Sequence, residues 1–342
     1  MLTFPIFDGH LDLAYLAESG RDLTCGLDTC GGIDLPASVT FPSLAAGQVC
    51  GALATVFIQQ RRAPQGDMPG ATGAWCFGTP EEAHYAMWRQ LDWYQRWEER
   101  GLVRIVRSAA DLHWPPSPGG PIPIVIMLEG CPGLRNSADV AAVHRAGVRM
   151  ASLAWGEGTI YAGGDRQPGI GLSPAGRDLV AALEAHHIIH DTSHLSETAF
   201  WELLALTHGG ICATHSNARA LLPGWRFPDR HLSDAQAQAL WARGGVVGMN
   251  FCAPFLAMGR PAELADVVAH WEHWRTLAGT ADGLTVGSDM DGGFPATRLP
   301  VGLQATTQYP NLWAALAARG WDEATLRNLA GGTWHRFLKR WL

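Results

Sequence analysis

Short apolar segments recur along the 342-residue chain, and stretches of helical character separate most of them. Near-continuous apolar strands that alternate with helices are typical of a parallel sheet covered on both faces. Eight such units predict a (β/α)8 TIM barrel. A ninth apolar run, LVRIVRS at 102–108, predicts a short strand outside the barrel. The eight strand segments are TFPIF at 3–7, CGALATVFI at 50–58, PIPIVIMLEG at 121–130, VRMASLAW at 148–155, IIHDTSH at 188–194, GICATHS at 210–216, GVVGMNF at 245–251 and GLTVGSDMDG at 283–292.

The helical stretches support this α/β assignment. Residues 80–100 and 174–187 have helical character, and the second stretch follows Ser173, a candidate N-cap, with Pro174 at its first position. A doubly wound sheet is the alternative, but no G-x-G-x-x-G motif follows an early strand. Because barrels of this kind exceed the usual domain size, we expect a single domain over residues 1–342.

Composition excludes several kinds of partner. The formal net charge is −7 and no long basic run occurs, so neither nucleic acid nor an anionic membrane surface is expected to bind. The seven cysteines are scattered, which favours reduced thiols in a cytoplasm over a disulfide framework or a cysteine zinc site. The segment MLTFPIFDGH lacks the features of a signal peptide, and no segment is predicted to span a membrane. These features predict a cytoplasmic protein that acts on a small molecule.

Polar residues stand where five of the eight apolar segments end. The carboxyl ends of barrel strands meet at one rim, and enzymes with this architecture carry their catalytic residues there. We therefore expect these side chains to converge on one mouth of the barrel. They are His10 and Asp12, Glu129, His194, His215 and Asp289.

The spacing of His10 and Asp12 suits a metal ion. In a strand, residues i and i+2 face the same side and lie about 6.5–7 Å apart. Imidazole nitrogen and carboxylate oxygen are ligands for zinc, and also for manganese or iron. Taken singly, each motif has another explanation: H-x-D is common, a solvated helix end accounts for several histidines within 186–194, and Glu129 suits a helix N-terminus. The convergence of five strand ends favours a catalytic metal site.

Three imidazoles and two carboxylates exceed what one structural zinc needs. Two divalent cations, for which Zn²⁺ is the first choice, would lie about 3.5–4 Å apart and need an anion between them, and Glu129 is the candidate bridge. A water shared by both cations would have its pKa lowered from 15.7 towards about 7 and would supply hydroxide. Asp289 then fits the base that orients this water and carries its proton to the leaving group.

These residues lie in motifs whose order along the chain is informative. The chain resembles the membrane (renal) dipeptidase family, peptidase family M19, whose members are dinuclear zinc peptidases on an amidohydrolase-like barrel. The resemblance extends from residue 7 to about residue 292, and its H-x-D is distinctive because most related amidohydrolases carry H-x-H on the first strand. The matching motifs are DGHLDL, LEG at 128–130, GLSPAG at 171–176, DTSHLS at 191–196, THSNAR at 214–219, GGVVGMNF at 244–251 and VGSDMDG at 286–292.

The resemblance implies a role for each polar residue. Asp289 would be the catalytic acid/base, with Glu129 bridging two metal ions. One ion would be bound by His10, Asp12 and Glu129, and the other by Glu129, His194 and His215. Known members of the family are homodimers, which implies a homodimer here.

The resemblance also implies that Arg226 binds the free carboxylate of a dipeptide. A guanidinium suits this task because it forms two parallel hydrogen bonds with a carboxylate. The alternative is that Arg226 is a surface arginine after the Pro-Gly turn at 223–224.

The segment LAW at 153–155 departs from the family pattern, which has L-T-H there. In the family that histidine contacts the substrate and helps to stabilise the tetrahedral intermediate. The indole of Trp155 donates one hydrogen bond but cannot become a cation. Loss of a charge-assisted donor at a developing oxyanion is expected to cost about 10²–10³ in rate.

These observations leave more than one function open. The first hypothesis is a dinuclear zinc hydrolase of small peptide-like amides, namely a dipeptidase. The alternative is a biosynthetic or tailoring enzyme of the same fold that acts on a non-peptide substrate, because Trp155 replaces the substrate-binding histidine. A binding protein without activity is disfavoured, since several buried polar groups are costly to keep together without a metal.

Overall fold

The structure of the protein is a computed structural model, and it describes residues 2–62, 73–116 and 119–342. Eight parallel strands follow one another in the order β1-β2-β6-β7-β8-β9-β10-β11, and β5 (Val103–Ile105) pairs with β6 outside this path. The predicted (β/α)8 barrel and the extra strand are confirmed. The barrel strands are β1 (Ile6–Leu11), β2 (Val49–Phe57), β6 (Ile122–Glu129), β7 (Val148–Ala151), β8 (Ile189–Asp191), β9 (Ile211–Ser216), β10 (Val247–Met249) and β11 (Leu284–Val286).

The ring is nearly closed between β11 and β1. The amide of Asp289 donates to the carbonyl of His10 at 3.3 Å, and the amide of Ser288 donates to Asp8 Oδ1 at 2.8 Å. A small two-stranded sheet, β3 (Gln59–Gln60) and β4 (Cys76–Phe77), lies beyond the carboxyl end of β2. The strand order brings the carboxyl ends of distant segments to one rim.

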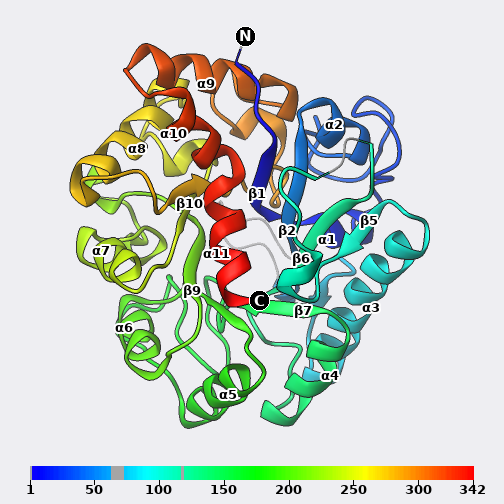
Figure 1. Cartoon of the computed structure of the whole chain (residues 1–342). Coiled ribbons are helices and arrows are strands. Elements are labelled where there is room, and N and C mark those ends of the chain that lie inside the picture. The colour runs from blue at the N-terminus through cyan, green and yellow to red at the C-terminus, as the bar shows by residue number, and fades with distance from the viewer. Residues whose placement is uncertain (1, 63–72, 117–118) are drawn as a thin grey trace.

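Helices surround the barrel (Figure 1). The predicted N-cap is present, because Ser173 Oγ accepts a hydrogen bond from the amide of Gly176 and Pro174 occupies the first turn. Thr79 caps α3 in the same way, by accepting from the amide of Glu82. The helices are α1 (Leu13–Glu18), α2 (Phe41–Ala46), α3 (Pro80–Glu99), α4 (Val140–Arg145), α5 (Pro174–Ala185), α6 (Glu197–Leu206), α7 (Asp234–Ala242), α8 (Leu264–Ala278), α9 (Tyr309–Ala318), α10 (Glu323–Arg327) and α11 (Thr333–Trp341).

The C-terminal helix α11 closes the amino end of the barrel and lies across its centre in Figure 1. Trp334 is fully buried, and its indole N–H donates to the carbonyl of Val286 at 2.7 Å. A Cβ atom at Gly9 would lie 2.6 Å from the Trp334 ring, so β1 packs directly on this helix. Trp334, Phe337 and Leu338 share one buried cluster with inward-facing strand residues. Access to the barrel interior is therefore left to the carboxyl end.

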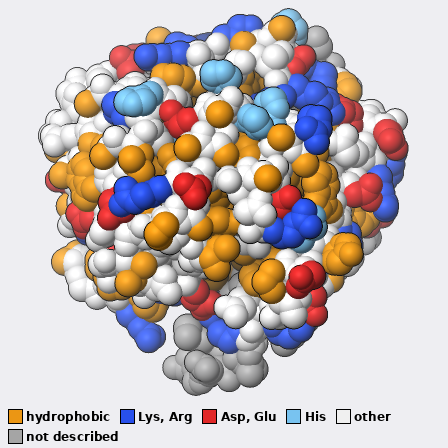
Figure 2. Space-filling model, turned by 90° about the horizontal axis from the view of Figure 1, so that it is seen from below, with side chains coloured by type: hydrophobic (Ala, Val, Ile, Leu, Met, Phe, Trp, Pro, Cys, Tyr) orange, Lys and Arg blue, Asp and Glu red, His pale blue; other side chains and the backbone are white. Residues whose placement is uncertain are grey.

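The surface offers no extended apolar area on the face that Figure 2 shows. There, hydrophobic side chains lie scattered among lysines, arginines, aspartates and glutamates. Within the described residues, no helix has both the length and the apolar character needed to cross a bilayer.

Candidate functional site

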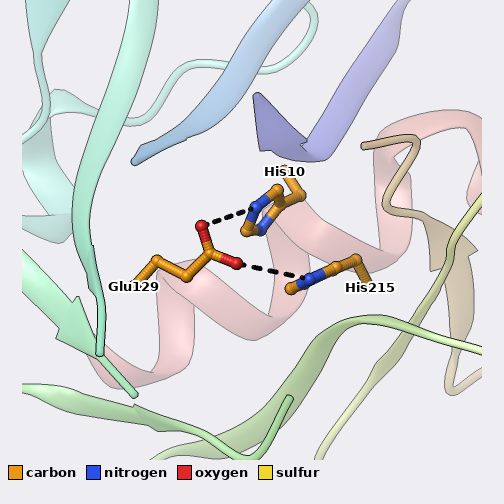
Figure 3. Close-up of side chains that lie close together, drawn as sticks. All are labelled: His10, Glu129 and His215. Atoms are coloured by element: carbon orange, nitrogen blue, oxygen red, sulfur yellow. Dashed lines mark ion pairs between the residues drawn. The ribbon is translucent and has the colours of Figure 1, made fainter. Parts of the chain in front are cut away.

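The three predicted imidazoles and two predicted carboxylates meet at the carboxyl end of the barrel. Glu129 ends β6, and its two carboxylate oxygens face different histidines: Oε2 lies 3.5 Å from His10 Nε2, and Oε1 lies 3.6 Å from His215 Nε2 (Figure 3). Oε1 also lies 3.2 Å from His194 Nε2. Asp12 completes the group, with its Oδ1 3.8 Å from His10 Nε2. One carboxylate therefore faces imidazoles from β1, from β9 and from the loop after β8.

Two of the three histidines lie inside strands, as the sequence predicts. The third lies in the loop that follows its strand. His10 and His215 are inside β1 and β9, whereas β8 ends at Asp191 and His194 follows in the loop. His194 has a φ of 67°. A non-glycine residue in this left-handed region is uncommon and persists when the surrounding structure holds it. This backbone turns the His194 ring back towards Glu129.

The other ring nitrogen of two histidines is held by a hydrogen bond. His194 Nδ1 lies 2.7 Å from Asp165 Oδ2, and His215 Nδ1 lies 2.8 Å from Thr214 Oγ1. Both rings consequently present Nε2 to Glu129, and these two nitrogens lie 2.9 Å apart. Metal-binding histidines usually have their second nitrogen fixed in this way.

The donor set fits divalent cations. Ligand atoms of His10, Glu129 and His215 lie within 4.8 Å of one another, as do those of His10, Asp12 and Asp289. Among the described residues, His10 Nε2 is buried and has no hydrogen-bond partner. A buried nitrogen that faces carboxylates and has no donor or acceptor at hydrogen-bond distance is well suited to bind a cation.

The crowding of acidic groups alters their pKa values. Burial, together with the negative charge of Glu129, raises the pKa of Asp12 to about 8 and that of Asp289 to about 6. Burial acts in the same direction on Glu129, but His10 and His194 outweigh it and hold the Glu129 pKa below its usual range. Such a cluster keeps one carboxylate charged at the expense of the others. Cations bound there would allow all of them to ionise.

Asp289 lies in the loop after β11, beside the proposed ligands. Its Oδ2 accepts a hydrogen bond from Asn250 Nδ2 at 2.8 Å. A Cβ atom at Gly292 would lie 1.8 Å from Asp289 Oδ1, so only glycine leaves room for this carboxylate. Sequence analysis did not assign a role to Asn250, although it lies within the motif GGVVGMNF.

Asp165 is a second residue that sequence analysis missed. It is 3% exposed, its carboxylate contacts His194 Nδ1, and its amide donates to the carbonyl of His194 at 2.7 Å. No local pattern marks it, because residues 165 and 194 are joined only through the folding of the loop after β7. Asp165 therefore fixes both the position and the tautomer of one proposed metal ligand.

We expect Asp165→Asn to weaken metal binding by about 10–100-fold, the usual cost of losing a carboxylate that orients a ligating histidine. Competition with a chromophoric chelator measures the affinity without reference to activity. Asp178→Asn, at an exposed position on α5, is the matched control. Equal metal affinity in the two variants would contradict the orienting role.

A cavity of about 520 Å³ opens above the cluster. Asp12, Glu129, His194 and Asp289 contribute to its lining, together with several aromatic and arginine side chains. Trp155 is among them, with its ring centroid 5.7 Å from that of His194. The indole that stands in place of the family's histidine therefore faces the cavity.

The structure does not bring Arg226 to this cavity. Arg226 is exposed, and its guanidinium lies 5.0 Å from the Phe227 ring. Arg230 lines the cavity instead: it is 4% exposed, and its Nη1 donates to the carbonyl of His215 at 2.9 Å. The turn Pro228–Arg230 carries the chain back to the barrel, so the later arginine enters. Spacing from His215 alone could not reveal where this loop turns.

Arg230 has donors available for an anion. Its Nε and Nη2 atoms are buried, and neither has a hydrogen-bond partner in the part of the chain that the structure describes. The guanidinium packs 4.8 Å from the centre of the Phe255 ring, and its Nε lies 4.0 Å from Asp165 Oδ2. A planar fork with unpaired N–H groups in a cavity suits a carboxylate.

A nearly closed parallel barrel with buried imidazoles and carboxylates at its carboxyl end defines a metal-dependent hydrolase. The chain belongs to the membrane dipeptidase family, peptidase family M19, whose sequence model matches residues 1–341. The predicted family membership is thus confirmed, and a divalent metal is implied.

The chain is also similar to individual curated proteins and solved structures. A Klebsiella pneumoniae protein described as "Uncharacterized protein in pqqA 5'region" is 33% identical over 267 residues, which cover 74% of this chain and 95% of that protein. Dipeptidase tcpJ from Claviceps purpurea is 34% identical over 209 residues, 59% of this chain and 47% of that one. A metallo peptidase from Rhodobacter sphaeroides, solved with a phosphinate mimic of the dipeptide L-Ala-D-Ala, superposes with a TM-score of 0.81 at 25% identity, covering 100% of both chains.

Proposed function

We propose that the protein is a dinuclear metal-dependent dipeptidase that hydrolyses a small amide with a free C-terminal carboxylate. The observation that carries this proposal is the arrangement around Glu129, whose two oxygens face His10 and His215 beneath a cavity that also contains Arg230. The imidazoles and carboxylates around Glu129 suit a metal-dependent hydrolysis, and Arg230 suits the C-terminal carboxylate of the substrate.

The metal ligands would be those expected from the sequence, with Zn²⁺ as the first choice for imidazole and carboxylate donors. When bound, two such cations supply Lewis acidity and lower the pKa of water towards about 7. One set would comprise His10, Asp12 and Glu129, and the other Glu129, His194 and His215. The two Glu129 oxygens support this division, since Oε2 faces His10 whereas Oε1 faces His194 and His215.

Asp289 would move the proton in this reaction. The attacking water forms a C–O bond as the amide C–N bond breaks, so one proton must pass from the water to the leaving nitrogen. Asp289 takes this proton at its carboxylate and gives it to the nitrogen. Asn250 fixes the Asp289 carboxylate by donating to Oδ2, which leaves Oδ1 for the reacting groups.

A biosynthetic or tailoring reaction on a non-peptide substrate is the second candidate, and the position of Trp155 in the cavity favours it. A screen of the zinc- and manganese-loaded protein on dipeptides separates the two. Hydrolysis of dipeptides supports the proposed function. Inert dipeptides with about two metal ions per chain would overturn it in favour of the second candidate.

Arg230→Ala should raise KM for dipeptides by about 10–100-fold, the cost of losing a charge-assisted hydrogen-bonded pair. The same variant should change KM little for a dipeptide amide, which lacks the carboxylate. Initial rates on each matched pair of substrates give the comparison. Arg226→Ala, at the position indicated by the sequence, is tested beside it. A larger effect from Arg226→Ala would return the carboxylate-binding role to that residue.

The homodimer, the cytoplasmic location and the single domain over residues 1–342 stay predictions.

A further inference from the structure

One side of the cavity is formed by four aromatic side chains that we call the aromatic wall: Tyr15, Phe57, Trp75 and Trp155. Each ring contacts the next edge to face. The ring centroid of Tyr15 lies 4.8 Å from that of Trp75 and 5.7 Å from that of Phe57. The centroids of Phe57 and Trp155 lie 5.4 Å apart, and the interplanar angles of the three pairs are 60–74°. These residues come from α1, β2, the loop before β4 and the loop after β7, so only the tertiary structure assembles them.

Aromatic residues are concentrated in this cavity. About a third of the residues that line it are aromatic, against 9% of the chain. Catalysis at the metal ligands requires none of them. Phe57, Trp75 and Trp155 are part-buried and leave aromatic surface in the cavity, whereas Tyr15 is 4% exposed and packs behind Phe57 and Trp75. Aromatic surface in a concave site is best explained by an apolar group of the substrate that covers it.

The aromatic wall borders the proposed metal ligands. Phe57 pairs in register with Glu129 across β2 and β6, and the Trp155 ring lies 5.7 Å from that of His194. An amide bond placed over Glu129 would thus have the wall on one side. The residue attached at that side of the amide would contact it.

The carboxylate-binding side of the cavity lies across the barrel from Phe57, whereas Trp155 lies between the two sides, since the Arg166 guanidinium packs against both Trp155 and Phe227. Arg230 follows β9, and β9 is four strand positions from β2 in a ring of eight. These two strands consequently face each other across the barrel axis. A dipeptide whose carboxylate is held by Arg230, and whose amide lies over Glu129, directs its N-terminal residue to the aromatic wall.

Trp155 packs against two neighbours, Arg166 and Phe57. The Arg166 guanidinium lies 4.9 Å from the centre of the Trp155 ring, and Arg166 Nη1 donates to Glu157 Oε1 at 3.1 Å. Because Arg166 packs over the indole and Phe57 contacts it at about 60°, these two neighbours orient the apolar surface of the ring. This role uses the area of the indole and does not require it to replace the proton-donating function of a histidine.

We propose that the aromatic wall is the subsite for the side chain of the N-terminal residue, and that the substrates are dipeptides in which this side chain is aromatic. The inference rests on the proposed function, because it takes the orientation from Arg230 and Glu129. An aromatic side chain adds further edge-to-face contacts and removes the wall from water, whereas a methyl group leaves most of the wall exposed.

The test compares L-Phe-L-Ala with L-Ala-L-Ala, and the same pair ending in D-Ala, on the zinc-loaded protein of 342 residues. We expect kcat/KM to be about 10–100-fold higher for the phenylalanine substrate of each pair, from burial of its ring. Trp75→Leu and Trp155→His should each reduce the ratio of the two kcat/KM values about tenfold, because kcat/KM falls further for the phenylalanine substrate than for the alanine substrate. Trp201→Leu, on the exposed side of α6, is the matched control and should keep the wild-type ratio.

The outcomes distinguish the two proposals. Hydrolysis of both substrates at equal kcat/KM would overturn the aromatic subsite and leave the dipeptidase function standing. A preference that survives both wall variants would also overturn it. Absence of hydrolysis for all four dipeptides would overturn the proposed function itself, and the subsite with it.

Discussion

Glu129→Gln is expected to abolish both metal binding and turnover. The substitution keeps the shape of the side chain but removes the charge that faces both His10 and His215. Two cations close together repel each other strongly unless an anion lies between them, so the neutral amide should fail to hold the pair. We expect metal content to fall from about two ions per chain to fewer than one, and kcat/KM to fall by at least about 10³.

Elemental analysis of the dialysed protein and thermal unfolding with and without added zinc measure the effect of this change. A ligand that binds only the folded state raises Tm, so the wild-type protein should gain stability from zinc and the variant should gain little. Glu99→Gln, at an exposed position on α3, is the matched control. A variant that retained two metal ions would show that Glu129 is not the bridge.

Asp289→Asn should separate catalysis from metal binding. The amide oxygen of asparagine can still accept from Asn250 Nδ2, so the local structure should persist. It cannot take up the proton that the attacking water must lose, and removal of a positioned general base costs about 10²–10⁴ in rate. We expect kcat to fall by this factor while metal content stays unchanged.

Elemental analysis beside steady-state kinetics decides between two roles for Asp289. Its carboxylate lies within ligand distance of His10 and Asp12, so a structural alternative is that it binds a metal ion directly. Loss of metal in Asp289→Asn would assign it to the ligand set and remove its proposed role in proton transfer. Asp282→Asn, in the exposed turn before β11, serves as the control for handling and folding.

Much of the fold was predictable from local patterns. Alternation of apolar segments with helices indicated the barrel, and Ser173 with Pro174 indicated the start of α5, because both signals depend on neighbours in the chain. The proximity of His10 and Asp12 was predictable because they are two residues apart, although β1 ends at Leu11 and Asp12 is the first residue after it. His194, His215 and Glu129 could be added because the carboxyl ends of barrel strands meet at one rim.

Loop paths were beyond these patterns. The choice of Arg230 over Arg226 depends on a turn at Pro228–Arg230, and the contact of Asp165 with His194 depends on how the loop after β7 folds back. The aromatic wall likewise combines residues from four separated segments. The sequence alone thus determined the barrel and predicted which polar residues gather at its rim, because the carboxyl ends of the strands meet there. Only the tertiary structure decided which side chains orient that centre and face the substrate, because packing between distant segments sets the course of the loops.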